Sequence, residues 1–99
     1  MVGNEVEMVR LSDKDRSAFV TDQQGWSIDR EILSKTFVLR DFNEAMGFVT
    51  RVGLLAEVAD HHPDIDIRWN RVTIALSTHG EGALTSKDTD LAQAVEGLT

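Results

Sequence analysis

The histidines of this 99-residue sequence are His61, His62 and His79. Imidazole titrates near neutral pH, so a group of histidines can both donate and accept a proton. Three histidines and a carboxylate could also hold zinc. However, adjacent histidines rarely direct both rings at one ion, and the HExxH spacing is absent. We therefore expect proton-transfer chemistry that needs neither a metal nor a cofactor.

Two carboxylates precede the adjacent histidines. Spacings of three and four residues relate Glu57, Asp60 and His61, which places them on one face at the end of a predicted helix. Carboxylates in a last turn oppose the helix dipole, and a local rule broken without structural gain is expected where function requires it. Spacing alone also allows a solvent-exposed helix end with an incidental histidine.

The helices that must position these residues are predicted from their caps. We expect helices over residues 13–20, from 42 to no further than 61, and over 86–96. Each begins after a residue suited to the N-cap, with an acidic residue three positions later. These pairs are Ser12–Asp15, Asp41–Glu44 and Thr85–Asp88. The first role expected of Asp88 is therefore to cap its own helix.

Four strands are predicted over residues 26–28, 32–39, 65–69 and 72–79 from their alternation and β-branched residues. Trp69 continues the apolar face of Ile65 and Ile67, so we expect it in the core, before a turn at residues 70–71. His79 is expected on the last strand, facing the same way as Ser77. The order α-β-β-α-β-β-α predicts an α+β fold with two layers, a four-stranded antiparallel sheet with helices packed on one face.

The central helix is apolar over much of its circumference. Its apolar positions at helical spacing are Phe42, Ala45, Met46, Val49, Val52, Ala56 and Ala59, and the positions that widen this stripe are Phe48, Leu54, Leu55 and Val58. One sheet face usually covers a narrower stripe than this. We therefore expect this helix to pack both on its own sheet and on another subunit.

Composition limits the remaining classes of function. Hydrophobic residues make up 41% and charged residues 27%, which suits one globular domain over residues 1–99. The absence of cysteine excludes disulfides and thiolate chemistry, and a net charge of −7 argues against nucleic-acid binding. Residues 1–7 lack the pattern of a signal peptide, and no apolar run reaches the roughly 18 residues of a membrane span. We expect a cytoplasmic protein.

The spacing of the candidate residues resembles a family signature. Glu57, His61-His62-Pro63, Trp69, His79 and Asp88, separated by three, five, nine and eight residues, are similar to the signature of the pterin-4a-carbinolamine dehydratases. The likeness extends over nearly the whole chain and includes Gly25-Trp26, the segments 41–48 and 50–52, and Leu76-Ser77-Thr78-His79. Residues 16–24 depart from the leucine-rich first helix of that family, which affects the expected packing there.

The resemblance implies a hydro-lyase that converts 4a-hydroxytetrahydropterin to quinonoid dihydropterin, in recycling of the tetrahydrobiopterin-type cofactor of aromatic amino-acid hydroxylases. It implies that the three histidines are the catalytic group. We assign His61 and His79 as the acid–base pair, and we expect His62 to hold the leaving hydroxyl or to substitute for one of the pair. The substrate-binding residues that the resemblance implies are Glu57, Asp60, Ser77, Thr78, Trp26 and Asp88. Asp88 could also fix His79. A homodimer or homotetramer is expected.

The resemblance also leaves a second class of function. Some members of the family act as dimerisation cofactors for a homeodomain transcription factor, through the central helix. The broad apolar stripe from Phe42 to Val58 permits such a protein-interaction role. That role does not need three histidines together with Glu57 and Asp60, so the intact cluster favours the enzyme. The acidic net charge argues against direct contact with DNA.

Overall fold

The computed structural model describes residues 9–99, so the expectation about residues 1–7 lies outside the described residues. The helices and strands follow the predicted order. The helices are α1 (Asp13–Asp22), α2 (Phe42–Ala59) and α3 (Ser86–Glu96), with a 3-10 turn η1 (His79–Glu81) before α3. The strands are β1 (Ser27–Asp29), β2 (Ile32–Val38), β3 (Asp64–Arg68) and β4 (Arg71–Leu76).

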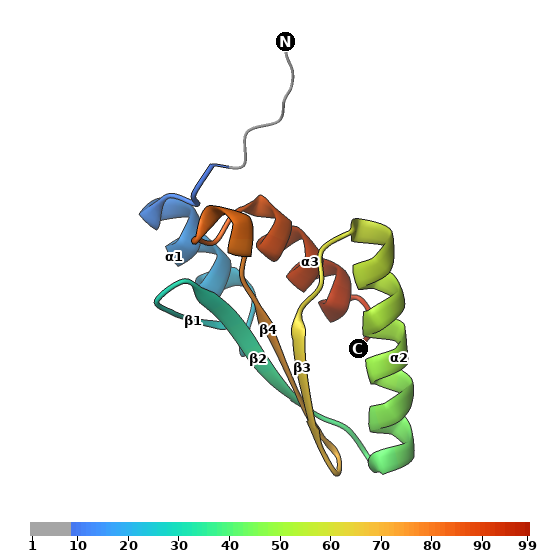
Figure 1. Cartoon of the computed structure of the whole chain (residues 1–99). Helices are drawn as coiled ribbons and strands as arrows, with labels where there is room; N and C mark the ends of the chain where they lie inside the picture. The colour runs from blue at the N-terminus through green and yellow to red at the C-terminus, as the bar shows by residue number, and fades with distance from the viewer. Residues whose placement is uncertain (1–8) are drawn as a thin grey trace.

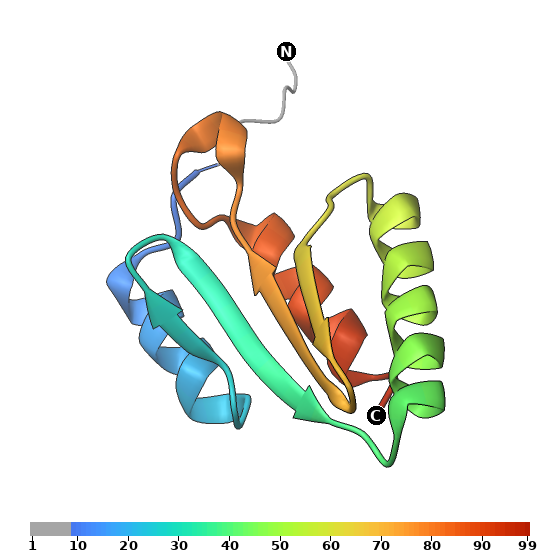
Figure 2. The same cartoon turned by 60° about the horizontal axis from the view of Figure 1, so that its bottom comes forward.

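The strands form one antiparallel sheet in the order β1-β2-β4-β3. The helices lie on one face of this sheet, with α1 beside β1 and α2 beside β3 (Figures 1 and 2). The inward apolar side chains of β2 and β4 are fully buried or nearly so; they are Leu33, Phe37, Val72, Ile74 and Leu76. The opposite face carries small polar side chains such as Thr36 and Thr73, whose hydroxyls are 2.8 Å apart. The predicted α+β fold with two layers is confirmed.

The helices begin where their caps predict. Ser12 accepts from the backbone N–H of Asp15, and Asp41 accepts from that of Glu44 at 2.8 Å. The Glu44 N–H holds the pKa of Asp41 below its ordinary value, because the hydrogen bond favours the ionised carboxylate. Helix α1 continues two residues beyond the predicted end at residue 20.

The prediction that Trp69 lies in the core is wrong. Arg68 pairs with Arg71, so the tight turn occupies residues 69–70, one position earlier than expected. Trp69 takes a left-handed conformation with φ +53 and is 68% exposed. The alternation of β3 stops at Arg68 because the chain reverses there, so Trp69 does not continue the inner face. Asn70 fixes the turn by donating from Nδ2 to the Leu39 carbonyl at 2.9 Å.

The last strand also ends earlier than predicted. β4 stops at Leu76, which pairs with Leu33 near the start of β2. The other neighbour of β4 is β3, which begins at Asp64, opposite Ala75. The residue before it, Pro63, has no backbone N–H with which to extend the pairing. The chain therefore leaves the sheet, and His79 lies in η1 rather than on a strand face.

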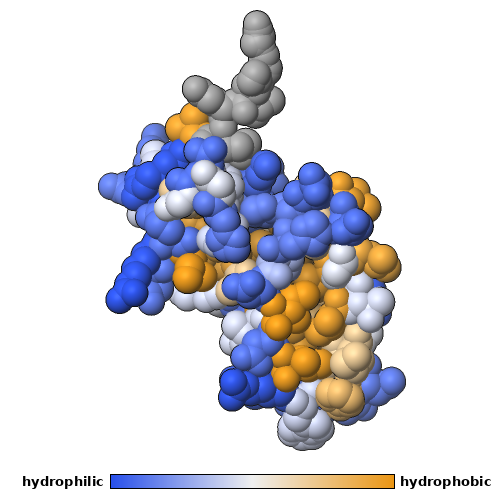
Figure 3. All heavy atoms as spheres, viewed as in Figure 1, coloured by the Kyte–Doolittle hydropathy of each residue, from blue (hydrophilic) through white to orange (hydrophobic). Residues whose placement is uncertain are grey.

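Helix α2 buries only part of its apolar surface against the sheet. Its buried residues are Ala45, Phe48, Val52 and Ala56, so Phe48 belongs to the centre of the buried face. Its exposed large apolar residues are Phe42, Met46, Leu54 and Val58. Figure 3 shows apolar surface gathered over neighbouring parts of β3 and α2. Within residues 9–99, no helix has the length and apolar character to cross a membrane.

Candidate active site

The C-terminal end of α2 turns His61 out of the helix. Asp60 adopts the left-handed conformation (φ 52, ψ 43), and its N–H donates to the Glu57 carbonyl at 3.2 Å. The His61 N–H donates to the Ala56 carbonyl at 3.1 Å. These two bonds form a Schellman motif, in which aspartate occupies the position that glycine usually takes. The expectation that Glu57, Asp60 and His61 share one helix face is wrong, because the helix ends at Ala59.

His61 reaches the first turn of α3. Its Nε2 lies 2.6 Å from Oδ1 of Asp88, and the two side chains are 11% and 0% exposed. Asp88 is both the N3 residue of the α3 capping box and the partner of His61. The expectation that Asp88 fixes His79 is corrected, because the carboxylate contacts His61 instead.

Two buried threonines complete the surroundings of Asp88. Its Oδ2 accepts from the Thr85 N–H at 3.0 Å and from the Thr78 hydroxyl at 2.7 Å. The Thr78 and Thr85 hydroxyl oxygens are 2.8 Å apart. Two donors therefore occupy Asp88 Oδ2, and Oδ1 lies against His61 Nε2. A carboxylate on one ring nitrogen fixes the orientation of an imidazole and leaves the other nitrogen for chemistry.

His62 and Glu57 form a separate pair on the surface. His62 Nε2 lies 2.8 Å from Glu57 Oε1, and the side chains are 59% and 78% exposed. Asp60 is also exposed. Solvent screens a pair of this kind, so it contributes little to stability. These side chains are mostly exposed to solvent, whereas His61 and Asp88 are mostly buried.

His61 and His79 line different hollows of the surface. His61 lies at a hollow of about 300 Å³ between α2 and α3, where Leu55 and Leu91 supply apolar wall. His79 lies with Ser77 and Thr78 at a hollow of about 400 Å³ beside the β1–β2 turn. Thr78 lies between the two hollows. It directly precedes His79 in the chain, and its hydroxyl bonds Asp88, which contacts His61.

Trp26 lies apart from these histidines. It is 4% exposed and packs edge-on against Phe19 and Phe37, with ring centroids 6.4 and 6.0 Å away. Its Nε1 donates to Glu96 at 2.9 Å. Glu96 follows Asp88 by eight residues in α3, which corresponds to about 12 Å along the helix axis. Core packing and this hydrogen bond account for the position of Trp26.

Two residues of the region were missed by sequence reasoning. The sequence indicated Thr85 only as the N-cap of α3. Its position three residues before Asp88, in the same capping box, was the one signal that it contacts this carboxylate. Glu31 binds Arg16 at 2.7 Å and accepts from the Leu84 N–H at 2.9 Å, which ties the start of β2 to the segment that enters α3. These contacts, the Arg16 hydrogen bond first, lower the pKa of Glu31 to about 2. No sequence pattern signalled the ion pair, because its members are 15 residues apart.

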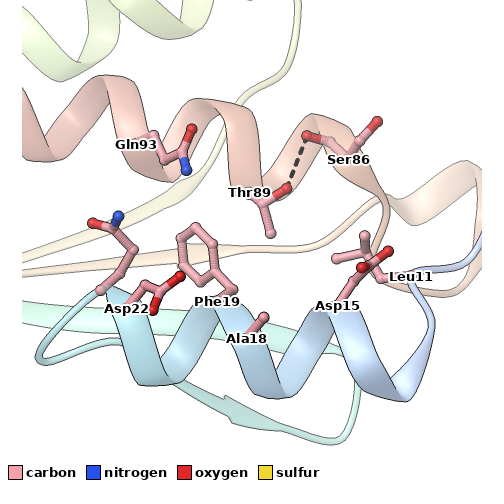
Figure 4. Close-up of a pocket in the computed structure, with 9 residues that line it drawn as sticks. Leu11, Asp15, Ala18, Phe19, Asp22, Ser86, Thr89 and Gln93 are labelled. Atoms are coloured by element: carbon pink, nitrogen blue, oxygen red, sulfur yellow. Dashed lines mark hydrogen bonds between the residues drawn. The ribbon is translucent and has the colours of Figure 1, made fainter.

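A further groove lies between α1 and α3 (Figure 4). Its volume is about 360 Å³, and its lining residues are Leu11, Asp15, Ala18, Phe19, Asp22, Gln23, Ser86, Thr89 and Gln93. None of the predicted site residues lines it, so we place the candidate active site around His61, Asp88 and Thr78. In the described part of the chain, no three His, Cys, Asp or Glu side chains gather as metal ligands would.

Most of the chain is similar to proteins of one known family. A family model described as pterin 4 alpha carbinolamine dehydratase matches residues 9–98. A protein of Roseiflexus sp. (strain RS-1) is 48% identical over 89 residues, which cover 90% of this chain and 96% of that protein. A protein of Chloroflexus aggregans (strain MD-66 / DSM 9485) is 50% identical over 93 residues, which cover 92% and 98%. Both carry the provisional name pterin-4-alpha-carbinolamine dehydratase.

Two solved structures share the fold. A transcriptional coactivator/pterin dehydratase from Brucella melitensis superposes with a TM-score of 0.84 and 33% identity, over 90% of this chain and 97% of that chain. A pterin dehydratase-like protein described as a RuBisCO assembly factor in the alpha-carboxysome gives a TM-score of 0.62 at 22% identity, over 74% and 84%. The second likeness bears on the fold alone.

Proposed function

Because the chain belongs to the pterin-4-alpha-carbinolamine dehydratase family, we propose that it removes water from 4a-hydroxytetrahydropterin to give quinonoid dihydropterin. The observation that carries this proposal is the 2.6 Å contact between His61 Nε2 and the buried Asp88. A histidine held by a carboxylate in this way suits repeated proton transfer, because its ring orientation and tautomer are fixed before the substrate arrives.

The reaction needs two proton transfers and no change of oxidation state. The C4a–oxygen bond breaks as the hydroxyl takes a proton and leaves as water, the N5 proton is removed, and a C4a–N5 double bond forms. We assign these transfers to His61, through Nδ1, and to His79, and the leaving hydroxyl to His62. Acid–base help of this kind is worth roughly 10²–10⁴-fold in rate.

The pterin ring would be held by acceptors around the histidines. Its amino-pyrimidinone edge carries N–H donors, which the exposed carboxylates of Glu57 and Asp60 suit. Ser77 and Thr78 line the hollow beside His79 and would supply the Ser77 hydroxyl and backbone groups from the other side, because the Thr78 hydroxyl already bonds Asp88 and Thr85. The buried Trp26 has no part in this proposed binding site.

The test is dehydration of synthetic 4a-hydroxytetrahydropterin by the purified chain. His61→Ala and His79→Ala should each lower kcat by roughly 10²–10⁴-fold, while Lys14→Ala on the exposed side of α1 should not. The rate of the unmodified protein should vary with pH between about 5 and 9, where imidazole titrates. Two fully active histidine variants, or a flat pH profile, would refute the mechanism.

A second role is favoured by the exposed face of α2. Phe42, Met46, Leu54 and Val58 leave this helix with apolar surface uncovered in the single chain. We propose that it packs in a homodimer or homotetramer, and that an apolar partner helix is the alternative occupant. Leu54→Glu should lower the mass observed by sedimentation at micromolar concentration. An unmodified protein that is purely monomeric would contradict the proposed packing.

We also propose a pathway and a compartment for this reaction. Regenerated dihydropterin would serve an aromatic amino-acid hydroxylase in the cytoplasm. A coupled assay with such a hydroxylase and limiting pterin should turn over faster when the chain is added. An unchanged rate, with dehydratase activity present, would separate the reaction from this pathway.

A further inference from the structure

We propose that Thr85 is a positioning residue for His61, acting through Thr78 and Asp88. The proposal rests on the proposed function for its effect on the reaction. The chain of contacts runs from the Thr85 hydroxyl to the Thr78 hydroxyl (2.8 Å), then to Asp88 Oδ2 (2.7 Å), and from Asp88 Oδ1 to His61 Nε2 (2.6 Å). Thr85 and Asp88 are fully buried and Thr78 nearly so, which shields these contacts from water.

The direction of the contacts follows from the number of protons available. A hydroxyl oxygen has one proton and two acceptor positions. The Thr85 oxygen accepts from the backbone N–H groups of Lys87 and Asp88 at the start of α3. Its own proton is then left for Thr78. The Thr78 hydroxyl, having accepted from Thr85, donates its single proton to the Asp88 carboxylate, which has none to give.

Asp88 is thereby fixed in one orientation. Its Oδ2 holds the Thr78 hydroxyl and the Thr85 N–H, so Oδ1 is the oxygen that remains for His61. Because this oxygen accepts, His61 carries its proton on Nε2. The nitrogen that exchanges a proton with a ligand is then Nδ1. Thr85 touches neither His61 nor the reacting atoms, so its contribution is orientation.

The N-cap role of Thr85 must be separated from its role toward His61. Glycine is accepted at N-caps, so Thr85→Gly removes the hydroxyl while keeping a tolerated cap residue. Thr85→Ser keeps the hydroxyl. Ser12→Gly makes the equivalent change at the N-cap of α1, which has no connection to a histidine. Thr78→Val breaks the same chain of contacts while the Thr85 cap stays intact.

The experiment measures the tautomer of His61 and the kinetics in the same proteins. Imidazole ¹⁵N chemical shifts of the folded, ligand-free chain should show the Nε2–H tautomer in the unmodified protein, Thr85→Ser and Ser12→Gly. Thr85→Gly and Thr78→Val should show mixed tautomers. Thr85→Gly should lower kcat about 10- to 100-fold, as loss of an orienting partner does, and leave KM within about twofold.

Each outcome decides the proposal. It is overturned by an Nδ1–H tautomer in the unmodified protein, by a Thr85→Gly protein that keeps tautomer and kcat, or by equal losses in Thr85→Ser and Thr85→Gly. If Thr85→Gly does not fold, Thr78→Val decides the tautomer in the same way. If the tautomers behave as expected and the unmodified chain does not dehydrate the pterin, the positioning role stands and the proposed function fails.

Discussion

His61 and Asp88 are 27 residues apart in the sequence, yet His61 Nε2 lies 2.6 Å from Asp88 Oδ1. The contact joins the end of α2 to the start of α3. It gives Asp88 two roles, because the same carboxylate caps α3 by accepting from the Thr85 N–H. The position of the histidine therefore depends on how these two helices pack.

Replacement of Asp88 by asparagine should impair both stability and catalysis. The amide oxygen is needed by the two donors at the Oδ2 position, so the NH2 group faces His61 Nε2, where it either opposes a buried Nε2–H or forces the ring into the Nδ1–H tautomer. We expect the free energy of unfolding in urea to fall by about 1–3 kcal/mol. We also expect kcat to fall by roughly 10²-fold or more, because His61 loses its acceptor. Asp22→Asn at the exposed end of α1 is the control, and an Asp88→Asn protein with normal kcat would contradict the assigned role of the pair.

The surface pair of Glu57 and His62 should behave in the opposite way. Both side chains are more than half exposed, so Glu57→Gln should change the free energy of unfolding by less than about 0.5 kcal/mol. If Glu57 accepts from the pterin, KM should rise several-fold while kcat changes little. Urea unfolding and steady-state kinetics check both parts. An unchanged KM would remove Glu57 from the binding site.

Glu31 should make stability depend on acidic pH. Its pKa is about 2 in the folded chain against an ordinary 4.5, because Arg16 and the Leu84 N–H bind the ionised form. A lowered folded pKa stabilises the protein above the unfolded value, and this contribution is lost as the pH falls through 4.5 towards 2. Glu31→Gln should therefore have a lower urea midpoint than the unmodified protein at pH 7.

The difference between these two midpoints should disappear near pH 2. Glu81→Gln is a matched control, because Glu81 is an exposed glutamate of η1. It should show no such trend. A midpoint difference for Glu31→Gln that stays constant from pH 7 to pH 2 would show that the ionised carboxylate does not provide the stabilisation.

Replacing Trp69 by asparagine should stabilise the monomer. The left-handed conformation at φ +53 disfavours a large aromatic residue, and asparagine tolerates it. Because 68% of Trp69 is exposed, its removal loses little buried apolar area. We expect Trp69→Asn to raise the free energy of unfolding by about 1 kcal/mol, with Trp69→Phe unchanged. A loss of stability in dilute solution would show that Trp69 makes stabilising contacts within the chain.

Local patterns predicted the elements and failed where the chain reverses. The caps at Ser12, Asp41 and Thr85 located the three helix starts, because an N-cap acts on groups within three residues of itself. Alternation placed the strands but carried Trp69 into the core and His79 onto β4. Both errors lie at strand ends, where pairing with neighbouring strands decides how far a strand extends.

The sequence by itself determined the order of the elements, the cap at each helix start and the residues that can transfer protons. These depend on side-chain chemistry and on spacings of a few residues. The tertiary structure decided which residues meet. A left-handed Asp60 turns His61 towards α3, helix packing brings it to Asp88, and the early end of β4 sets Thr78 against that carboxylate. Such contacts join residues 10 to 27 positions apart, and their formation depends on the burial of the whole core.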